Sequence, residues 1–141
     1  MKTSCFKIAG KIPGGISIAR THPRSFKGPE YKPLFPPADL LGWYKTWLRR
    51  NRRFINLTEL WGEYCSRYRR DVLNYLDSQS AYEALVLAAK GYEPILLCWE
   101  EPEYTDGYMG GWRATCHRSI VAAWLSSELK ISVREYPPEA V

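Results

Sequence analysis

With 141 residues and 45% hydrophobic content, the chain fits one domain with a single small core, which excludes several catalytic domains. Its formal net charge of +5 creates a positive field that attracts nucleotides, nucleic acid or other anions, although the same charge also serves solubility. No apolar run reaches the ~20 residues that span a bilayer, and the first residues lack the apolar core of a signal peptide. We therefore expect a cytoplasmic protein with no membrane partner.

Two short strands are predicted at the N-terminal end. The first covers Thr3–Ala9, and a turn rich in Gly and Pro over Lys11–Gly15 leads to the second at Ile16–Ala19. Arg20 follows directly. If the second strand runs parallel to the apolar run Ile95–Trp99, Arg20 emerges at the same sheet edge as the residues that end that run.

The proline-rich segment from Pro23 to Pro37 excludes a regular helix or a central strand. Its aromatic residues favour an ordered loop, and we expect it to fold over a crevice at the sheet edge. Arg24, Lys27 and Lys32 would then be anion contacts. The alternative is a basic surface loop without a ligand.

Three helices are predicted before the apolar run. The first begins at Pro37-Ala38-Asp39 and ends in the arginine run 49–53. The second starts near Thr58 and carries apolar and aromatic residues at intervals of about four up to Leu76. The third extends over Ala81–Lys90, with Ser80 as its N-cap and Gly91 as its stop.

The rest of the chain predicts a buried strand, a helix and a last strand. The continuous apolar run Ile95–Trp99 is typical of a strand buried on both faces of a parallel sheet. Thr115 is a candidate N-cap for a helix ending at Leu129, and Ile131–Tyr136 predicts the final strand. We therefore expect one compact α/β domain over residues 1–141, three-layered and Rossmann-like, with a short, mostly parallel sheet of about four strands.

Reactive residue types gather where the apolar run ends and the next helix begins. Cys98 and Glu100 would lie at the rim of the crevice beyond the strand ends, while Cys116, His117 and Arg118 would form the first turn of the helix. A helix N-terminus favours an anion and lowers a thiol pKa, and an arginine adds a planar donor fork for phosphate or carboxylate. Each has a structural alternative: small buried cysteines, a satisfied histidine and a solvated ion-pair arginine.

The cysteines indicate reduced thiols rather than a metal-binding module. Cys5, Cys65, Cys98 and Cys116 lie far apart and form no C-x-x-C pair, which argues against a zinc ribbon. The spacing of Cys98, Cys116 and His117 is not diagnostic of a metal site, so that possibility stays open. No metal and no cofactor is predicted.

A series of short motifs runs along most of the chain. In chain order they are Thr3-Ser4-x-Phe6, Ile16–Arg20, Phe26-Lys27-Gly28, Tyr31-Lys32, Leu34, Pro36, Tyr68, Val72, Leu73, Leu76, Asp77, Leu96–Glu100, Cys116-His117-Arg118 and Ala123-Trp124-Leu125. In these motifs the chain resembles the uncharacterised family numbered 488 among domains of unknown function. The resemblance implies a compact α/β fold and no established activity. Two departures stand out: Cys5 replaces a more usual aromatic residue, and the segment Glu101–Thr115 is longer than the family's loop.

The leading functional hypothesis is a site for a nucleotide or another phosphate-bearing ligand. Arg20, Arg118 and the helix amides would hold the anion, with His117 and Cys98 beside them. Glu100 would contact a ribose hydroxyl or act as a general base, and Cys116 would be the nucleophile of a hydrolase or transferase. No Cys-x5-Arg, G-x-G-x-x-G or Walker motif is present, so whether the chain is an enzyme stays open.

Two alternatives come from other features of the chain. Nucleic acid could bind to the basic loop 23–32 and to the clusters at 49–53 and 67–70. An interaction or regulatory module could use the expanded segment 101–115 and the surplus of aromatic residues. The oligomeric state is not predicted.

Overall fold

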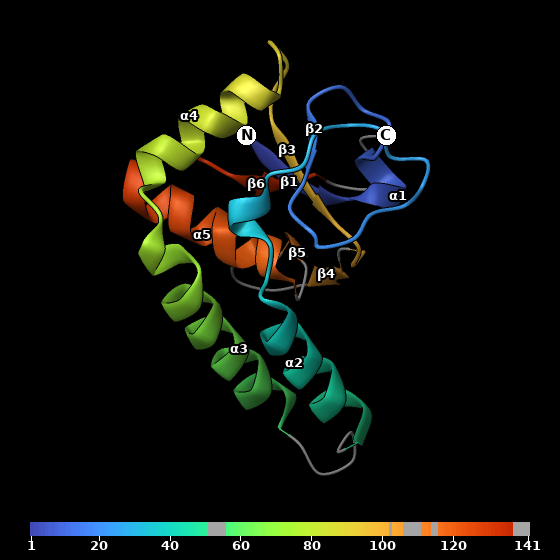
Figure 1. The fold of residues 1–141 in the computed structure, drawn as a ribbon, viewed down its shortest axis with the longest axis vertical. Helices are drawn as coiled ribbons and strands as arrows, with labels where there is room; N and C mark the ends of the chain where they lie inside the picture. The colour runs from blue at the N-terminus through green and yellow to red at the C-terminus, as the bar shows by residue number, and fades with distance from the viewer. Residues whose placement is uncertain (51–55, 102, 106–110, 114–115, 137–141) are drawn as a thin grey trace.

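A four-stranded, all-parallel sheet forms the centre of the computed structural model, which describes residues 1–50, 56–101, 103–105, 111–113 and 116–136 (Figure 1). The strands are β1 (Lys2–Cys5), β2 (Gly15–Ser17), β3 (Ile95–Cys98) and β6 (Arg134–Glu135), in the order β2-β3-β1-β6. The expected α/β fold with about four mostly parallel strands is confirmed.

The register of the sheet brings the carboxyl ends of its strands together. Cys5 of β1 pairs with Cys98 of β3, and Ser17 of β2 pairs with Leu97. Because side chains alternate along a strand, β3 contributes to two separate cores. Leu96 packs in the larger core with helix residues, while Ile95 and Leu97 pack in the smaller one. Ile95–Cys98 are therefore buried on both faces, as predicted, whereas Trp99, which was expected in the same strand, lies beyond its end and is half exposed.

Helices cover both faces of the sheet, so the fold has three layers. On one side are α3 (Leu57–Asp71), α4 (Ser78–Ala88) and α5 (His117–Leu129), whose apolar residues build the larger core. On the other side is α1 (Phe6–Ala9), which packs in the smaller core (Figure 1). Helix α2 (Ala38–Arg50) lies beside α3, and the two extend away from the sheet as a hairpin (Figure 1).

The limits of several elements differ from the sequence-based expectation. The first strand stops at Cys5 rather than Ala9, because α1 starts at Phe6. The helix expected to continue to Leu76 ends at Asp71 and is followed by a 3-10 turn, η2 (Leu73–Tyr75). The last strand covers only Arg134–Glu135 of the expected Ile131–Tyr136.

The helix caps also differ from those expected. Asn56, rather than Thr58, caps α3, since its side-chain oxygen accepts hydrogen bonds from the backbone N–H groups of Thr58 and Glu59 at 3.0 and 3.2 Å. Asp77, rather than Ser80, caps α4 by accepting from the Ser80 N–H at 2.8 Å. Both are preferred N-cap residue types. The expected cap Thr115 lies outside the described residues, and Cys116 holds the N-cap position of α5.

The proline-rich segment does not fold over the crevice as a whole, contrary to the prediction. Ser17 donates its backbone N–H to the Pro29 carbonyl and accepts from the Tyr31 N–H, both at 2.9 Å. A proline has no N–H but keeps its carbonyl, so Pro29 can still pair with the free edge of β2. The segment thus covers a sheet edge, and the 3-10 turn η1 (Lys32–Leu34) leads on to α2.

The expanded segment 101–115 contains two short strands that pair with each other. They are β4 (Glu103–Thr105) and β5 (Gly111–Arg113), antiparallel, with Tyr104 opposite Trp112. Neither strand was expected from the sequence. Within the described ranges, no helix is both long and apolar enough to cross a bilayer.

Candidate functional site

A crevice of about 610 Å³ opens at the carboxyl ends of β2 and β3, beside α2. We call it the rim crevice. The residues that line it are Arg20, Thr21, Pro36, Ala38, Leu41, Gly42, Lys45, Cys98, Trp99, Glu100 and His117. Its volume lies within the roughly 300–1,000 Å³ typical of small-molecule sites. A crevice at this edge of the sheet was expected from the sequence.

Two cations and one carboxylate line the rim crevice. Arg20 follows β2 and donates from Nη1 to the Pro36 carbonyl at 3.2 Å, which orients its guanidinium. Lys45 comes from α2, where Ala38, Leu41 and Lys45 share one face because they lie three and seven positions apart. Among the carboxylates that the structure describes, none forms an ion pair with Arg20 or Lys45. Glu100 is exposed at the same rim.

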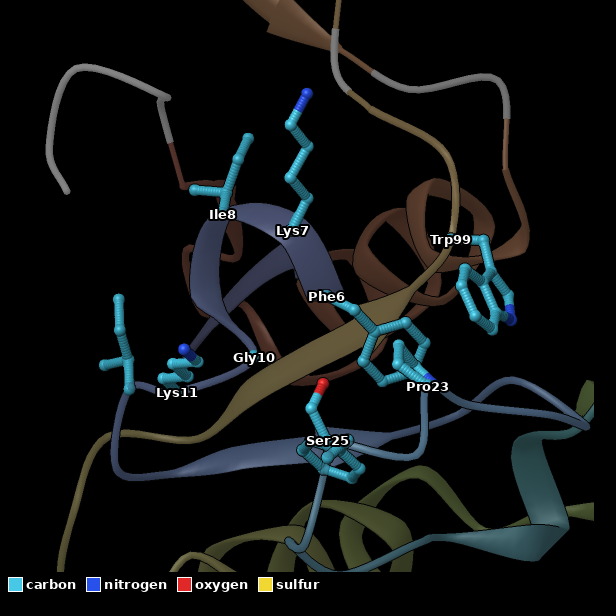
Figure 2. Close-up of a pocket in the computed structure, with 10 residues that line it drawn as sticks. Phe6, Lys7, Ile8, Gly10, Lys11, Pro23, Ser25 and Trp99 are labelled. Atoms are coloured by element: carbon cyan, nitrogen blue, oxygen red, sulfur yellow. The ribbon is translucent and has the colours of Figure 1, made fainter.

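Trp99 separates the rim crevice from a second hollow. Its indole N–H donates to the Thr21 carbonyl at 2.9 Å, so the ring is held in place although 49% of the residue is exposed. The second hollow, of about 500 Å³, lies between α1 and the segment at Pro23–Phe26. Figure 2 shows Trp99 beside Phe6, with Lys7 pointing away from Ser25. Lys7 pairs with Glu101 at 2.7 Å.

Cys98 and Cys116 are joined by a disulfide bond beneath the rim crevice. Cys98 ends β3 and Cys116 caps α5, so the fold brings together two residues that are 18 positions apart. Both are at least 96% buried. The expectation of four reduced thiols is wrong for this pair, although the two cysteines were expected at the same edge of the sheet. Cys5 and Cys65 are free.

His117 begins α5 and lies almost completely buried at the inner wall of the crevice. Its Nε2 atom is 2.7 Å from the Ile18 carbonyl, so Nε2 carries the proton and donates it, which leaves a lone pair on Nδ1. The pKa of His117 is lowered to about 4, mainly by burial; the hydrogen bond to Ile18 opposes this shift, and the nearby positive charge of Arg118 adds to it. The imidazole is therefore neutral at neutral pH, and it contributes no positive charge to the crevice.

Arg118 points into the protein rather than into the crevice. Its Nε donates to Glu135 of β6 at 2.7 Å, and its Nη1 donates to Cys98 Sγ at 3.2 Å. Neither Arg118 nor the Glu135 side chain is more than 7% exposed, and the Thr3 hydroxyl also donates to Glu135 at 2.9 Å. Burial raises the pKa of Glu135, while Arg118 opposes that rise. Arg118 thus forms a buried ion pair behind the crevice, and its expected anion contact stays a prediction.

The basic residues of the proline-rich segment lie away from this site. Arg24, Lys27 and Lys32 are exposed but are not among the residues that line the rim crevice. Two arginines of the 67–70 cluster have partners of their own: Arg67 pairs with Glu63 and lies 4.1 Å from the ring centre of Trp43, and Arg70 pairs with Asp71. Most of the 49–53 run lies outside the described residues. The nucleic-acid hypothesis stays a prediction.

Three residues of the site were missed by the sequence analysis. Lys45 and Trp99 line the rim crevice, and Glu135 neutralises Arg118. The helical spacing of Ala38, Leu41 and Lys45 predicts that they share one face of a helix, but not that this face borders the crevice. No local signal predicts the pairing of Arg118 with Glu135, since β6 must first join the sheet.

Comparisons of the chain with family models, with curated proteins and with solved structures found no match.

Proposed function

We propose that the chain binds a nucleotide or another phosphate-bearing small molecule in the rim crevice. One observation carries the proposal: Arg20 and Lys45 line the same hollow, and neither is neutralised by a described carboxylate. Charge-assisted hydrogen bonds from Arg and Lys are the strong interactions by which proteins hold phosphate. The motifs that resemble family 488 include Arg20 and Cys98-Trp99-Glu100, and we propose membership of that family on the same residues.

The other groups at the rim suit the remainder of a nucleotide. The indole of Trp99 is half exposed and fixed by Thr21, so it offers a rigid surface on which a base can stack. Glu100 is an acceptor for a sugar hydroxyl at the same edge. We therefore propose that the ligand is a nucleotide. Its phosphate would contact Arg20 and Lys45, and its base would stack on Trp99.

A thermal-shift titration tests the proposal, because a ligand that binds the folded state raises its apparent stability. ATP, AMP, a sugar phosphate and inorganic phosphate are the probes. We expect a nucleotide to raise Tm in the wild type. Arg20→Ala and Lys45→Ala should each weaken binding by about 10- to 100-fold, the loss of one charge-assisted contact worth about 1.5–3 kcal/mol. Arg24→Ala is the matched control and should bind as the wild type does.

Filling the rim crevice with a larger side chain gives a second, independent test. Gly42 lines the rim crevice, and a Cβ added there meets no atom within 4 Å, so Gly42→Leu should fill the hollow without disturbing α2. Gly62→Leu is its control, because Gly62 has the same free space on α3 away from the crevice. Loss of the nucleotide response in Gly42→Leu alone supports the proposal. A response that persists in Gly42→Leu and in the Arg20→Ala, Lys45→Ala double variant refutes it.

A further inference from the structure

Three metal-binding side chains meet beneath the rim crevice. The sulfur atoms of Cys98 and Cys116 and a ring nitrogen of His117 lie within 4.8 Å of one another, and all three residues are buried. They come from the end of β3 and from the start of α5, two elements that pack together. In the structure the two sulfurs form a disulfide, so this triad is available to a metal only after reduction.

The orientation of His117 matches that of a metal ligand. Its Nε2–H donates to the Ile18 carbonyl at 2.7 Å, and its Nδ1 lone pair lies 3.6 Å from Cys116 Sγ. Metal-binding histidines usually donate their other ring N–H to a carbonyl or carboxylate, which fixes both the tautomer and the ring plane. The backbone of Ile18 performs that role here, and it leaves Nδ1 directed at the sulfurs.

The surroundings of the cysteines suit thiolates with a metal between them. The Cα atoms of Cys98 and Cys116 are 7.6 Å apart, so after reduction the backbone leaves room for an ion between the two sulfurs. Arg118 Nη1 donates to Cys98 Sγ at 3.2 Å, which favours a thiolate. Glu135 balances the charge of Arg118, and two thiolates balance a divalent ion, so the buried cluster is neutral.

We infer that the reduced protein binds one Zn²⁺ ion through Cys98, Cys116 and His117, with the fourth coordination position facing the rim crevice. Two sulfurs and one imidazole nitrogen suit zinc, and three protein ligands with one open position are typical of zinc sites that bind an exogenous group. Cys98 and His117 line the rim crevice, so that position is accessible from it. The inference does not depend on the proposed nucleotide site.

The site forms by a balanced exchange. Two equivalents of a small thiol reduce the Cys98–Cys116 disulfide, giving two cysteine thiols and one oxidised thiol dimer. Zn²⁺ then displaces the two thiol protons and takes the lone pair of His117 Nδ1. The disulfide form has lost both sulfur ligands, so only the reduced protein can bind the ion.

Cobalt substitution of the full chain tests the site. The protein is reduced with a phosphine, freed of reductant without oxygen, and titrated with Co²⁺, whose tetrahedral thiolate complexes absorb strongly. We expect a saturable spectrum at one ion per chain that Zn²⁺ removes. The disulfide form should give none. A reduced wild type without a saturable thiolate spectrum overturns the inference, as does equal binding by the disulfide form.

Single variants assign the ligands. Cys98→Ser, Cys116→Ser and His117→Gln should each reduce the affinity for Co²⁺ at least tenfold. Glutamine replaces the histidine because a side-chain amide can still donate to the Ile18 carbonyl, which preserves the fold. Cys65→Ser is the control, since Cys65 is a half-buried free thiol on α3. Cys5 is buried and in register with Cys98, so loss of binding in Cys5→Ala would contradict the three-ligand assignment.

Thiol counting with an aromatic disulfide reagent gives a readout that does not depend on cobalt. In denaturant the oxidised protein should show two reactive thiols and the reduced protein four, because Cys5 and Cys65 are free in both. In the folded, reduced protein, Zn²⁺ should slow the modification of Cys98 and Cys116 and leave Cys65 unchanged. Modification of both cysteines at an unchanged rate with saturating Zn²⁺ refutes the site.

Discussion

Arg118 shows that the position of a residue can be predicted from the sequence without its partners. It lies in the first turn of α5, as expected from the sequence, and is fully buried. Its guanidinium turns inward because Glu135 and Cys98 accept its N–H groups. The carboxylate comes from β6, which follows α5 in the chain, and no local pattern marks that partner. Arg20, at the end of β2, could be placed at the crevice because its strand pattern was local.

Removing Arg118 should destabilise the protein strongly. In Arg118→Ala, the Thr3 hydroxyl is the one donor that Glu135 keeps among the described side chains, and no described cation pairs with the buried carboxylate. We expect the free energy of unfolding to fall by about 3–5 kcal/mol. Urea denaturation measures it. Arg70→Ala, which removes an exposed pair with Asp71, is the control and should cost less than about 1 kcal/mol. If the two variants lost the same free energy of unfolding, the buried ion pair would contribute no more to stability than the exposed one, which would contradict this prediction.

His117 should make the stability of the metal-free, disulfide-bonded protein depend on pH. Its folded-state pKa of about 4 lies below the ordinary 6.5, so between these values the unfolded chain binds a proton that the folded protein does not. Stability therefore falls as the pH drops through this window. From pH 7 to pH 5 the wild type should lose about 2 kcal/mol more than His117→Gln. Glu135, whose raised pKa acts in the opposite direction, is present in both proteins. Equal pH slopes would contradict this account.

At the scale of elements, periodic patterns predicted well and element ends did not. The apolar run of β3 and the helical spacing in α2, α3 and α5 are repeated signals, each carried by several residues. The end of a helix or strand, in contrast, depends on a few hydrogen bonds, so the sequence predicts it less well. The first strand gives way to α1 after Cys5, although Phe6 to Ala9 also fits a strand, because Phe6 and Ala9 pack together in the smaller core. At these residues tertiary packing outweighs the local preference for a strand.

Substitutions at two glycines measure how a turn and a helix contribute to the stability of the protein. Gly14, before β2, has φ +95°, and a Cβ there would collide with the Glu93 carbonyl. Gly14→Ala should cost more than about 1 kcal/mol, since both the conformation and the contact are unfavourable. Gly62→Ala lies within α3 with open space around it and should stabilise the protein by about 1 kcal/mol. Thermal denaturation compares them. Destabilisation by Gly62→Ala, or tolerance of Gly14→Ala, would contradict these assignments.

At the scale of the whole molecule, the parallel sheet explains why the position of the crevice could be predicted from the sequence, whereas not all of its lining residues could. Parallel strands expose their carboxyl ends at one edge, so Arg20, Cys98 and Glu100 were expected to meet there, and they line one crevice. The wall opposite them depends on where the α2–α3 hairpin packs, which strand and helix patterns do not determine. Lys45 and the open space at Gly42 therefore came only from the structure.

The most direct measurement is a map of amide chemical shifts during a titration with ATP. If the rim crevice binds the nucleotide, the amides of Arg20, Lys45 and Trp99 should shift saturably in the wild type and stay unchanged in Gly42→Leu. Saturable shifts centred on Arg67 to Arg70 or on Lys7 and Lys11, or no saturable shifts at all, would contradict the account.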